Sequence, residues 1–419
     1  MHQFSKQRAL ALALVLPFAG CSAPGSSALP SSGAGSGANA VPAEISAFLY
    51  VLNEGNSGSS SSSSSSNGSL AEFHAGRPHL LNDISDGINA PRGMAFDGNG
   101  NVYVANGGGS SSSSSSGSNG SVSVYVAHGS EQVRTITRGI NEPDAVAVDS
   151  NGTVYVANLG GSGSSSSSSS SSGGSVTVYR HGHNRVAYVI TAGISSPRAL
   201  AMDNDNNLYV LNGAAASSSS GSNNGSVAVF ALHHRSPSMV LTSGIDSPTA
   251  LAVDGAGDVF VANAGTSSNG TTTGSGSNAS GGSVLEFSAG SRTPTATITN
   301  GIAMPRALAL DGTGSLFVAN EAGGSSSSSS SSANGTVAVY PSGTTTPSRV
   351  INDGITAPDA LAVASNGMLF VANAPSSSSS SSSSSAGSNG NVQVYQAGHS
   401  SPRFTITNAI AMPIALGVN

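Results

Sequence analysis

Short runs of alternating apolar and polar residues recur along most of the chain, and turn-forming residues bound each run. The commonest unit reads Gly-Ile-x-x-Pro, an apolar run that ends in Asp, a Gly/Asn turn, and then Val-Tyr-Val-Ala-Asn or a close variant. Alternating β-branched and aromatic residues between such turns favour strands over helices. The pattern therefore predicts an all-β repeat protein. The unit occurs at residues 87–106, 139–158, 193–212, 244–263, 301–320 and 354–373.

Each repeat contains four expected strands, which in the second repeat cover residues 145–149, 153–157, 175–179 and 186–191. Four short strands every ~40–50 residues are typical of the blades of a β-propeller. The repeated phrase resembles the NHL-type propeller repeat over nearly all of residues 46–419. This resemblance implies the fold but no single function, because the superfamily contains binding proteins, scaffolds and enzymes.

The two ends of the repeat region each contain part of a blade. Residues 48–53 form an expected second strand with no innermost strand before it. Residues 410–416 form an expected innermost strand with no second strand after it. Pairing the two parts completes one blade and leaves no open sheet edge. We therefore predict a seven-bladed β-propeller of four-stranded antiparallel blades, whereas NHL-type propellers often have six.

The first residues have the composition of an export signal. Lys6 and Arg8 precede an apolar stretch at 9–16, and small residues follow, as in secretory signal peptides. The stretch is shorter than the ~20 apolar residues that span a bilayer. Residues 18–21, Phe-Ala-Gly-Cys, resemble the lipobox of bacterial lipoproteins. That resemblance implies a lipidated Cys21 as the mature N-terminus. The alternative is an ordinary signal peptide with an incidental cysteine.

These features divide the chain into a signal peptide at 1–20, a lipidated flexible tether at 21–45, and a propeller at 46–419. The expected location is the bacterial cell envelope, where a lipid anchor attaches the protein to a membrane. The propeller would face the periplasm or the exterior. Ser22 favours the outer membrane by lipoprotein sorting patterns. Cys21 is the only cysteine, so the chain cannot form an internal disulfide.

Charge and composition exclude several classes of partner. The chain has 14 Lys and Arg against 20 Asp and Glu, a net charge of −6, and only 8% of its residues are charged. Nucleic acid binding needs a basic surface that neutralises phosphates, so we expect no nucleic acid partner. The sequence contains no Gly-x-Ser-x-Gly or His-Glu-x-x-His motif and no phosphate-binding loop. We therefore expect no metal and no cofactor.

The strongest candidate site is the position that follows the proline of each repeat. In a propeller this position starts an innermost strand, so its side chains surround the mouth of the central channel. Arginine binds anionic oxygens and aspartate accepts hydroxyl protons, so the set predicts a carboxylate or carbohydrate site. The alternative is an architectural ring in which each Asp pairs with neighbouring Arg. The candidate ligand-binding residues are Arg92, Asp144, Arg198, Thr249, Arg306 and Asp359, and Ile414 has the seventh position.

Two other repeated polar positions are better explained by architecture. We expect the Asn that ends each second strand to bond backbone groups where the strand turns, although a ring of metal ligands is the alternative. We expect the Asp that follows each innermost strand to initiate a turn. The asparagines are Asn53, Asn106, Asn158, Asn212, Asn263, Asn320 and Asn373, and the aspartates are Asp97, Asp149, Asp203, Asp254 and Asp311.

Serine tracts follow the second strand of most repeats. Polyserine cannot bury apolar area to offset its ordering entropy, so we expect mobile loops. Neutral expansion of a tolerant loop explains them, and a selected brush or glycan acceptor is the alternative. The tracts are residues 59–66, 110–116, 164–172, 217–220, 325–332 and 376–385.

The sequence favours a non-catalytic function, as a binding or scaffold module for a protein or carbohydrate ligand in the envelope. The alternative is an enzyme that resembles the propeller lyases or lactonases, with its site at the channel mouth. Such an enzyme needs a general base. No His, Tyr or Glu stands at the start of an expected innermost strand.

Overall fold

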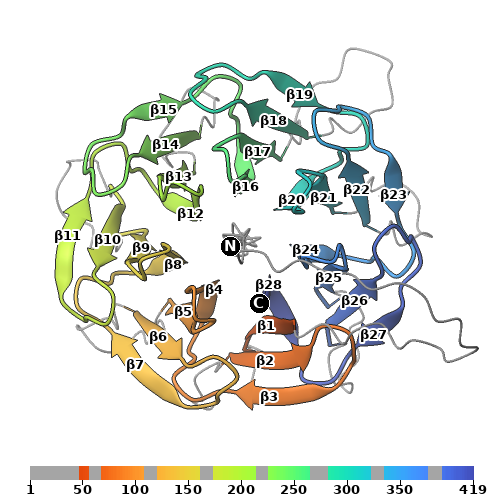
Figure 1. Cartoon of the computed structure of the whole chain (residues 1–419), viewed down its shortest axis with the longest axis horizontal. Helices are drawn as coiled ribbons and strands as arrows, with labels where there is room; N and C mark the ends of the chain where they lie inside the picture. The colour runs from red at the N-terminus through yellow and green to blue at the C-terminus, as the bar shows by residue number, and fades with distance from the viewer. Residues whose placement is uncertain are drawn as a thin grey trace, which may run out of the picture.

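The computed structural model describes residues 47–55, 68–107, 120–160, 173–213, 225–264, 282–321, 335–375 and 389–419. Cys21, the tether and the serine tracts lie outside them. The described residues form 28 strands in seven four-stranded antiparallel sheets, which surround one axis as blades (Figure 1). The predicted seven-bladed propeller is confirmed. Within these ranges no helix is long and apolar enough to cross a membrane.

Every blade has the same order of strands from the axis outward. The innermost strands are β4 (Pro91–Phe96), β8 (Pro143–Val148), β12 (Pro197–Met202), β16 (Pro248–Val253), β20 (Pro305–Leu310), β24 (Pro358–Val363) and β28 (Met412–Val418). The second strands are β1 (Phe48–Glu54), β5 (Val102–Asn106), β9 (Val154–Asn158), β13 (Leu208–Asn212), β17 (Val259–Asn263), β21 (Leu316–Asn320) and β25 (Leu369–Asn373).

The two outer layers complete each blade. The third strands are β2 (Ser69–His74), β6 (Ser121–Tyr125), β10 (Ser175–Tyr179), β14 (Ser226–Phe230), β18 (Ser283–Phe287), β22 (Thr336–Tyr340) and β26 (Asn391–Tyr395). The outermost strands are β3 (Leu80–Ile84), β7 (Gln132–Ile136), β11 (Val186–Ile190), β15 (Met239–Leu241), β19 (Ala296–Ile298), β23 (Arg349–Ile351) and β27 (Phe404–Ile406).

One blade is built from both ends of the propeller, as the partial repeats predicted. Its strand order is β28-β1-β2-β3, and β28 pairs antiparallel with β1. Two further backbone hydrogen bonds between Phe48 and Asn419 extend this pairing, with N···O distances of 2.8 and 3.0 Å. The pairing closes the ring, because β1 would otherwise present an unpaired edge.

The hydrophobic cores lie between adjacent blades. In β9, Tyr155 and Ala157 pack against the blade of β12 to β15, whereas Val154 and Val156 pack against the blade of β4 to β7. Successive side chains of a strand point to opposite faces, so a strand between two blades is apolar at consecutive positions. This arrangement explains why all five residues of β9 are buried.

The asparagine that ends each second strand connects that strand to the loop before the innermost strand. Asn212 Oδ1 accepts a hydrogen bond from the Ser195 backbone N–H (2.9 Å), and its Nδ2 donates to the Gly193 carbonyl (2.9 Å). The other six asparagines make equivalent bonds. The predicted structural role is confirmed, and these bonds position the start of every innermost strand.

The aspartate that follows an innermost strand initiates a turn, also as predicted. Asp149 Oδ1 accepts hydrogen bonds from the backbone N–H groups of Asn151 (2.9 Å) and Thr153 (2.8 Å). The same pair of bonds forms at Asp97, Asp203, Asp254 and Asp311.

Candidate functional site

Each candidate ring residue occupies a β-bulge. Pro143 pairs with Asn158 and Ala145 pairs with Ala157, so Asp144 has no partner in the register between β8 and β9. A bulge changes the direction of a side chain relative to the rest of the strand. The innermost strand therefore begins at the repeat proline, two residues earlier than predicted. An equivalent register shift leaves six other residues without a pairing partner: Arg92, Arg198, Thr249, Arg306, Asp359 and Ile414. We call these six residues and Asp144 the inner rim.

Three consecutive blades form the basic sector of the inner rim, which consists of Arg92, Asp144 and Arg198. Asp144 is 8% exposed. Burial raises the pKa of Asp144 above its ordinary value, and the positive charges of Arg198 and Arg92 offset part of this rise. No ion pair within 4 Å joins these three side chains. The architectural alternative, in which Asp pairs with neighbouring Arg, thus rests in this sector on longer-range attraction and not on a close ion pair.

The two arginines of the basic sector each lie against a glycine. A Cβ on Gly107 would lie 3.0 Å from Arg92 Nε, and a Cβ on Gly213 would lie 3.0 Å from Arg198 Nε. Both arginines are half-buried. The described residues provide neither guanidinium with a hydrogen-bond acceptor, so both groups remain able to bind an anion.

Arg306 has the same position in its repeat but a different neighbour. Its Nε donates to Glu321 Oε2 at 2.7 Å, and its Nη2 lies 2.5 Å from the same oxygen. Glu321 directly follows Asn320, where the other two blades have Gly107 and Gly213. The Arg306 charge is thus compensated within its own blade.

The remaining inner-rim positions are structural or lie beside acidic groups. The Thr249 hydroxyl donates to the Pro305 carbonyl of the next innermost strand at 2.7 Å. This hydrogen bond links two adjacent blades. Asp359, Ile414 and Glu54 line a small cavity of about 30 Å³ on the split blade and its neighbour. The rim is therefore net basic around β4, β8 and β12, neutral at β20, where Arg306 pairs with Glu321, and acidic around β24 and β28.

Two glutamates beside the inner rim were not predicted from the sequence. The predicted site comprised only the starts of the innermost strands, whereas Glu54 and Glu321 each stand one residue after the repeated asparagine of a second strand. Because that end pairs with the repeat proline, the residue after it lies beside the bulge. Comparing this position across the repeats would have found both.

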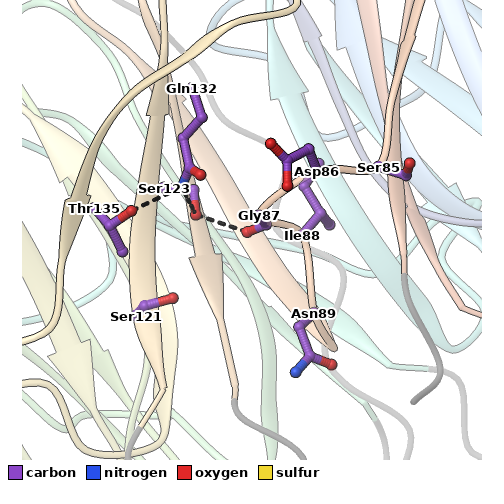
Figure 2. A pocket seen from close by; sticks show the side chains of 9 residues that line it. All are labelled: Ser85, Asp86, Gly87, Ile88, Asn89, Ser121, Ser123, Gln132 and Thr135. Atoms are coloured by element: carbon purple, nitrogen blue, oxygen red, sulfur yellow. Dashed lines mark hydrogen bonds between the residues drawn. The ribbon is translucent and has the colours of Figure 1, made fainter. Parts of the chain in front are cut away.

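A polar groove lies on the blade of β4 to β7, outside the inner rim (Figure 2). Its volume is about 570 Å³. The Ser123 hydroxyl donates to the Gly87 carbonyl (2.7 Å), and Gln132 Nε2 donates to the Ser123 and Thr135 hydroxyls (2.8 and 2.9 Å). These groups form a chain of hydrogen bonds along one wall, and the acidic Asp86 also lines the groove.

The groove lies where this blade differs from four others. In those four blades Val186, Pro237, Pro294 or Pro347 lies near the glycine that corresponds to Gly87, whereas in the blade of β24 to β27 Gln393 lies beside Gly354. Gln132 occupies that space here. Gln132 and Ser123 were not predicted to have a role, although a comparison of the repeats at these two positions shows that both differ from most other blades.

No group of three or more His, Cys, Asp or Glu that could hold a metal ion occurs within the described ranges. The asparagines bond backbone groups, as reported above, which leaves the alternative of a metal ring unsupported. Cys21, the predicted lipidation site, lies outside the described residues.

No family model matches the chain, and no curated protein matches it in sequence. The NHL-type resemblance therefore stays a prediction. Solved structures are similar in fold. Hydrazine synthase from Kuenenia stuttgartiensis is 17% identical over 73% of this chain and 86% of that chain, with a TM-score of 0.51. A putative 6-phosphogluconolactonase from Bacteroides fragilis is 14% identical over 90% of this chain and 99% of that chain, with a TM-score of 0.59. At these identities the likeness shows the propeller fold alone.

Proposed function

We propose that the protein is a non-catalytic binding module that captures a sugar acid, or a glycan bearing one, at the basic sector of the inner rim. The observation that carries the proposal is that Arg92 and Arg198 flank the buried Asp144 without forming ion pairs with it. A ligand carboxylate would bind the guanidinium groups, and a ligand hydroxyl would donate to Asp144. One ligand would thereby satisfy all three side chains.

The proposal places this module in the bacterial cell envelope. Residues 1–20 would be removed as a signal peptide, a lipidated Cys21 would anchor the chain, and residues 21–45 would hold the propeller away from the membrane. Ser22 favours the outer membrane. Cys21→Ser should release the protein from the membrane fraction or leave it unprocessed. A fully soluble wild-type protein with an unmodified terminus would contradict the anchor.

Calorimetric titration with glucuronate, and with uncharged glucose for comparison, tests the binding site. We expect saturable binding of glucuronate alone and a loss of roughly tenfold or more in affinity in Arg198→Ala, because a charge-assisted hydrogen bond is removed. Arg306→Ala is the matched control, since Arg306 has the same repeat position but is compensated by Glu321. Absence of saturable binding, or equal effects of the two substitutions, would overturn the proposed site.

A second candidate function is lactone hydrolysis, and the raised pKa of Asp144 favours it, because buried carboxyls with shifted pKa values are typical of acid–base catalysis. The structurally similar protein from Bacteroides fragilis is a putative 6-phosphogluconolactonase. Asp144 would accept a proton from water as the water oxygen bonds to the lactone carbonyl carbon. It would return that proton to the ring oxygen as the C–O bond breaks, which gives the open hydroxy acid. Gluconolactone hydrolysis that is faster with wild type than with Asp144→Asn would support catalysis, and equal rates would exclude it for Asp144.

A further inference from the structure

Two hairpins in neighbouring blades, on the propeller face opposite the inner rim, carry a local excess of basic residues. Residues 180–185 between β10 and β11 read Arg-His-Gly-His-Asn-Arg, and residues 231–238 between β14 and β15 read Ala-Leu-His-His-Arg-Ser-Pro-Ser. Neither contains an acidic residue, although the chain has 20 Asp and Glu against 14 Lys and Arg. Because successive strands run in opposite directions, both hairpins lie on the face opposite the inner rim.

A pocket of about 320 Å³ lies between these hairpins. Arg180, Tyr188, His233 and Arg235 supply polar lining, and Val178 and Ala187 supply apolar lining. The side chains come from two adjacent blades, so the complete pocket requires the assembled ring. Its volume is near the lower end of the ~300–1,000 Å³ that is usual for small-molecule sites.

Tyr188 carries an unsatisfied hydrogen-bonding group in this pocket. Its hydroxyl oxygen is buried and has no hydrogen-bond partner among the described residues. The neighbouring Tyr155 hydroxyl donates to Asp149 Oδ2 at 3.4 Å and also interacts with the Tyr188 hydroxyl, although no hydrogen bond of good geometry joins the two tyrosines. Burial raises the pKa of Tyr188, so the hydroxyl stays protonated at neutral pH. A buried donor without an acceptor is unfavourable, and a bound acceptor would remove that cost.

Arg235 reaches this tyrosine from the next blade. Its guanidinium carbon lies 4.9 Å from the centroid of the Tyr188 ring, within the range of a cation–π interaction. Stacking of this kind holds the planar guanidinium while leaving its N–H groups at the edge free to donate. Arg180, from the other hairpin, brings a second guanidinium to the pocket lining.

We propose that this pocket binds a tetrahedral oxyanion of the phosphate or sulfate class. Arg180 and Arg235 supply positive charge from two hairpins, and the Tyr188 hydroxyl donates from β11. An anion with four oxygens makes better use of donors from three separate elements than a planar carboxylate with two. The nearest carboxylate, Asp149, is 2% exposed and already accepts bonds from two backbone N–H groups.

Calorimetric titration of the full chain with inorganic phosphate, and with sulfate and acetate at the same pH and ionic strength, tests the proposal. We expect saturable binding of phosphate, sulfate or both, and much weaker binding of acetate. Arg235→Ala should weaken binding roughly tenfold or more. Tyr188→Phe should also weaken binding, yet it should keep or raise the melting temperature without phosphate, because it removes the unpartnered hydroxyl and retains the ring.

A control variant separates this pocket from other arginines. Arg134→Ala removes an arginine whose guanidinium carbon lies 5.8 Å from the Tyr103 ring centroid in the preceding blade, and it should bind phosphate like the wild type. The proposal is overturned if the wild type shows no saturable binding, if acetate binds equally well, or if Arg134→Ala and Arg235→Ala affect phosphate binding equally.

Discussion

The repeated asparagines of the second strands and the side chains of the inner rim lie at the same end of the blades. They differ in whether their polar groups have hydrogen-bond partners within the protein. The asparagines that end the second strands are buried and make the same backbone bonds in all seven blades. The bulged residues of the inner rim differ in charge from blade to blade, and Arg92 and Arg198 have no acceptor within the described ranges. A uniform scaffold therefore presents chemistry that is specific to each blade.

The difference between Arg198 and Arg306 shows what sets that chemistry. Both follow the repeat proline and both occupy a bulge. The residue after the neighbouring asparagine is Gly213 in one blade and Glu321 in the other, and only Glu321 can compensate a positive charge. Whether a rim arginine is paired with a carboxylate thus depends on the residue that follows the repeated asparagine of the same blade.

Removal of residues 409–419 should have the largest effect on the scaffold, because it deletes β28 and both backbone partners of Asn53. The loss should be several kcal/mol of a typical total of ~5–15 kcal/mol, so the protein should unfold or aggregate. Thermal melting followed by circular dichroism measures this. Deletion of the serine tract 376–385 is the control of similar length and should leave the melting temperature nearly unchanged. Equal melting of both deletions would show that the split blade does not close the ring.

A comparison of Asn212→Ala with Arg198→Ala tests the difference between scaffold asparagines and inner-rim residues within one blade. The asparagine change leaves the Ser195 N–H and the Gly193 carbonyl without their partner, and we expect a loss of about 2–4 kcal/mol in the free energy of unfolding. The arginine change should cost less, about 1 kcal/mol, because Arg198 has no hydrogen bond within the described structure and loses only its electrostatic interaction with Asp144. Urea unfolding measures both, and similar losses would remove the distinction between scaffold and rim.

Asp144→Asn should stabilise the protein at neutral pH. Because the folded-state pKa of Asp144 is raised, the folded form binds its proton more tightly than the unfolded chain does. Ionisation of Asp144 therefore costs stability, and this cost grows as the pH rises from about 4 through the folded-state pKa. The variant should have a higher melting temperature than wild type at pH 7 and a similar one at pH 3. A lower melting temperature at pH 7 would contradict the assignment.

Glu321→Gln should have the smallest effect, because the side chains of Arg306 and Glu321 are 29% and 33% exposed and water screens the pair. We expect a loss of less than about 1 kcal/mol that shrinks in high salt. Wild type and variant should converge in urea unfolding at 1 M NaCl. If the loss instead persists at that salt concentration, packing rather than charge would explain it.

Glu321→Gln also tests the comparison between Arg306 and Arg198. It frees the Arg306 guanidinium and so makes it resemble Arg198. Glucuronate titration of Glu321→Gln should then show whether an uncompensated rim arginine is enough to create a second site or whether the neighbouring Asp144 is also needed.

The sequence by itself determined the repeating scaffold. Alternating strands, Gly/Asn turns and the proline of each repeat act locally, so they predicted the strands, the number of blades and the closure by β28. The turn role of Asp149 and the backbone role of Asn212 were also predictable, because their partners lie within 2 to 19 residues. Strand limits shifted by one or two residues, since the bulge at Asp144 allows Pro143 to join the ladder.

Only the tertiary structure decided which side chains meet around those repeats. The ion pair of Arg306 with Glu321, the groove at Gln132 and the contact of Arg235 with Tyr188 all join different strands or different blades. A repeat pattern fixes the backbone of every blade alike, whereas charge compensation and pocket shape depend on individual side chains that packing brings together. The chemistry of this propeller therefore resides in its departures from the repeat.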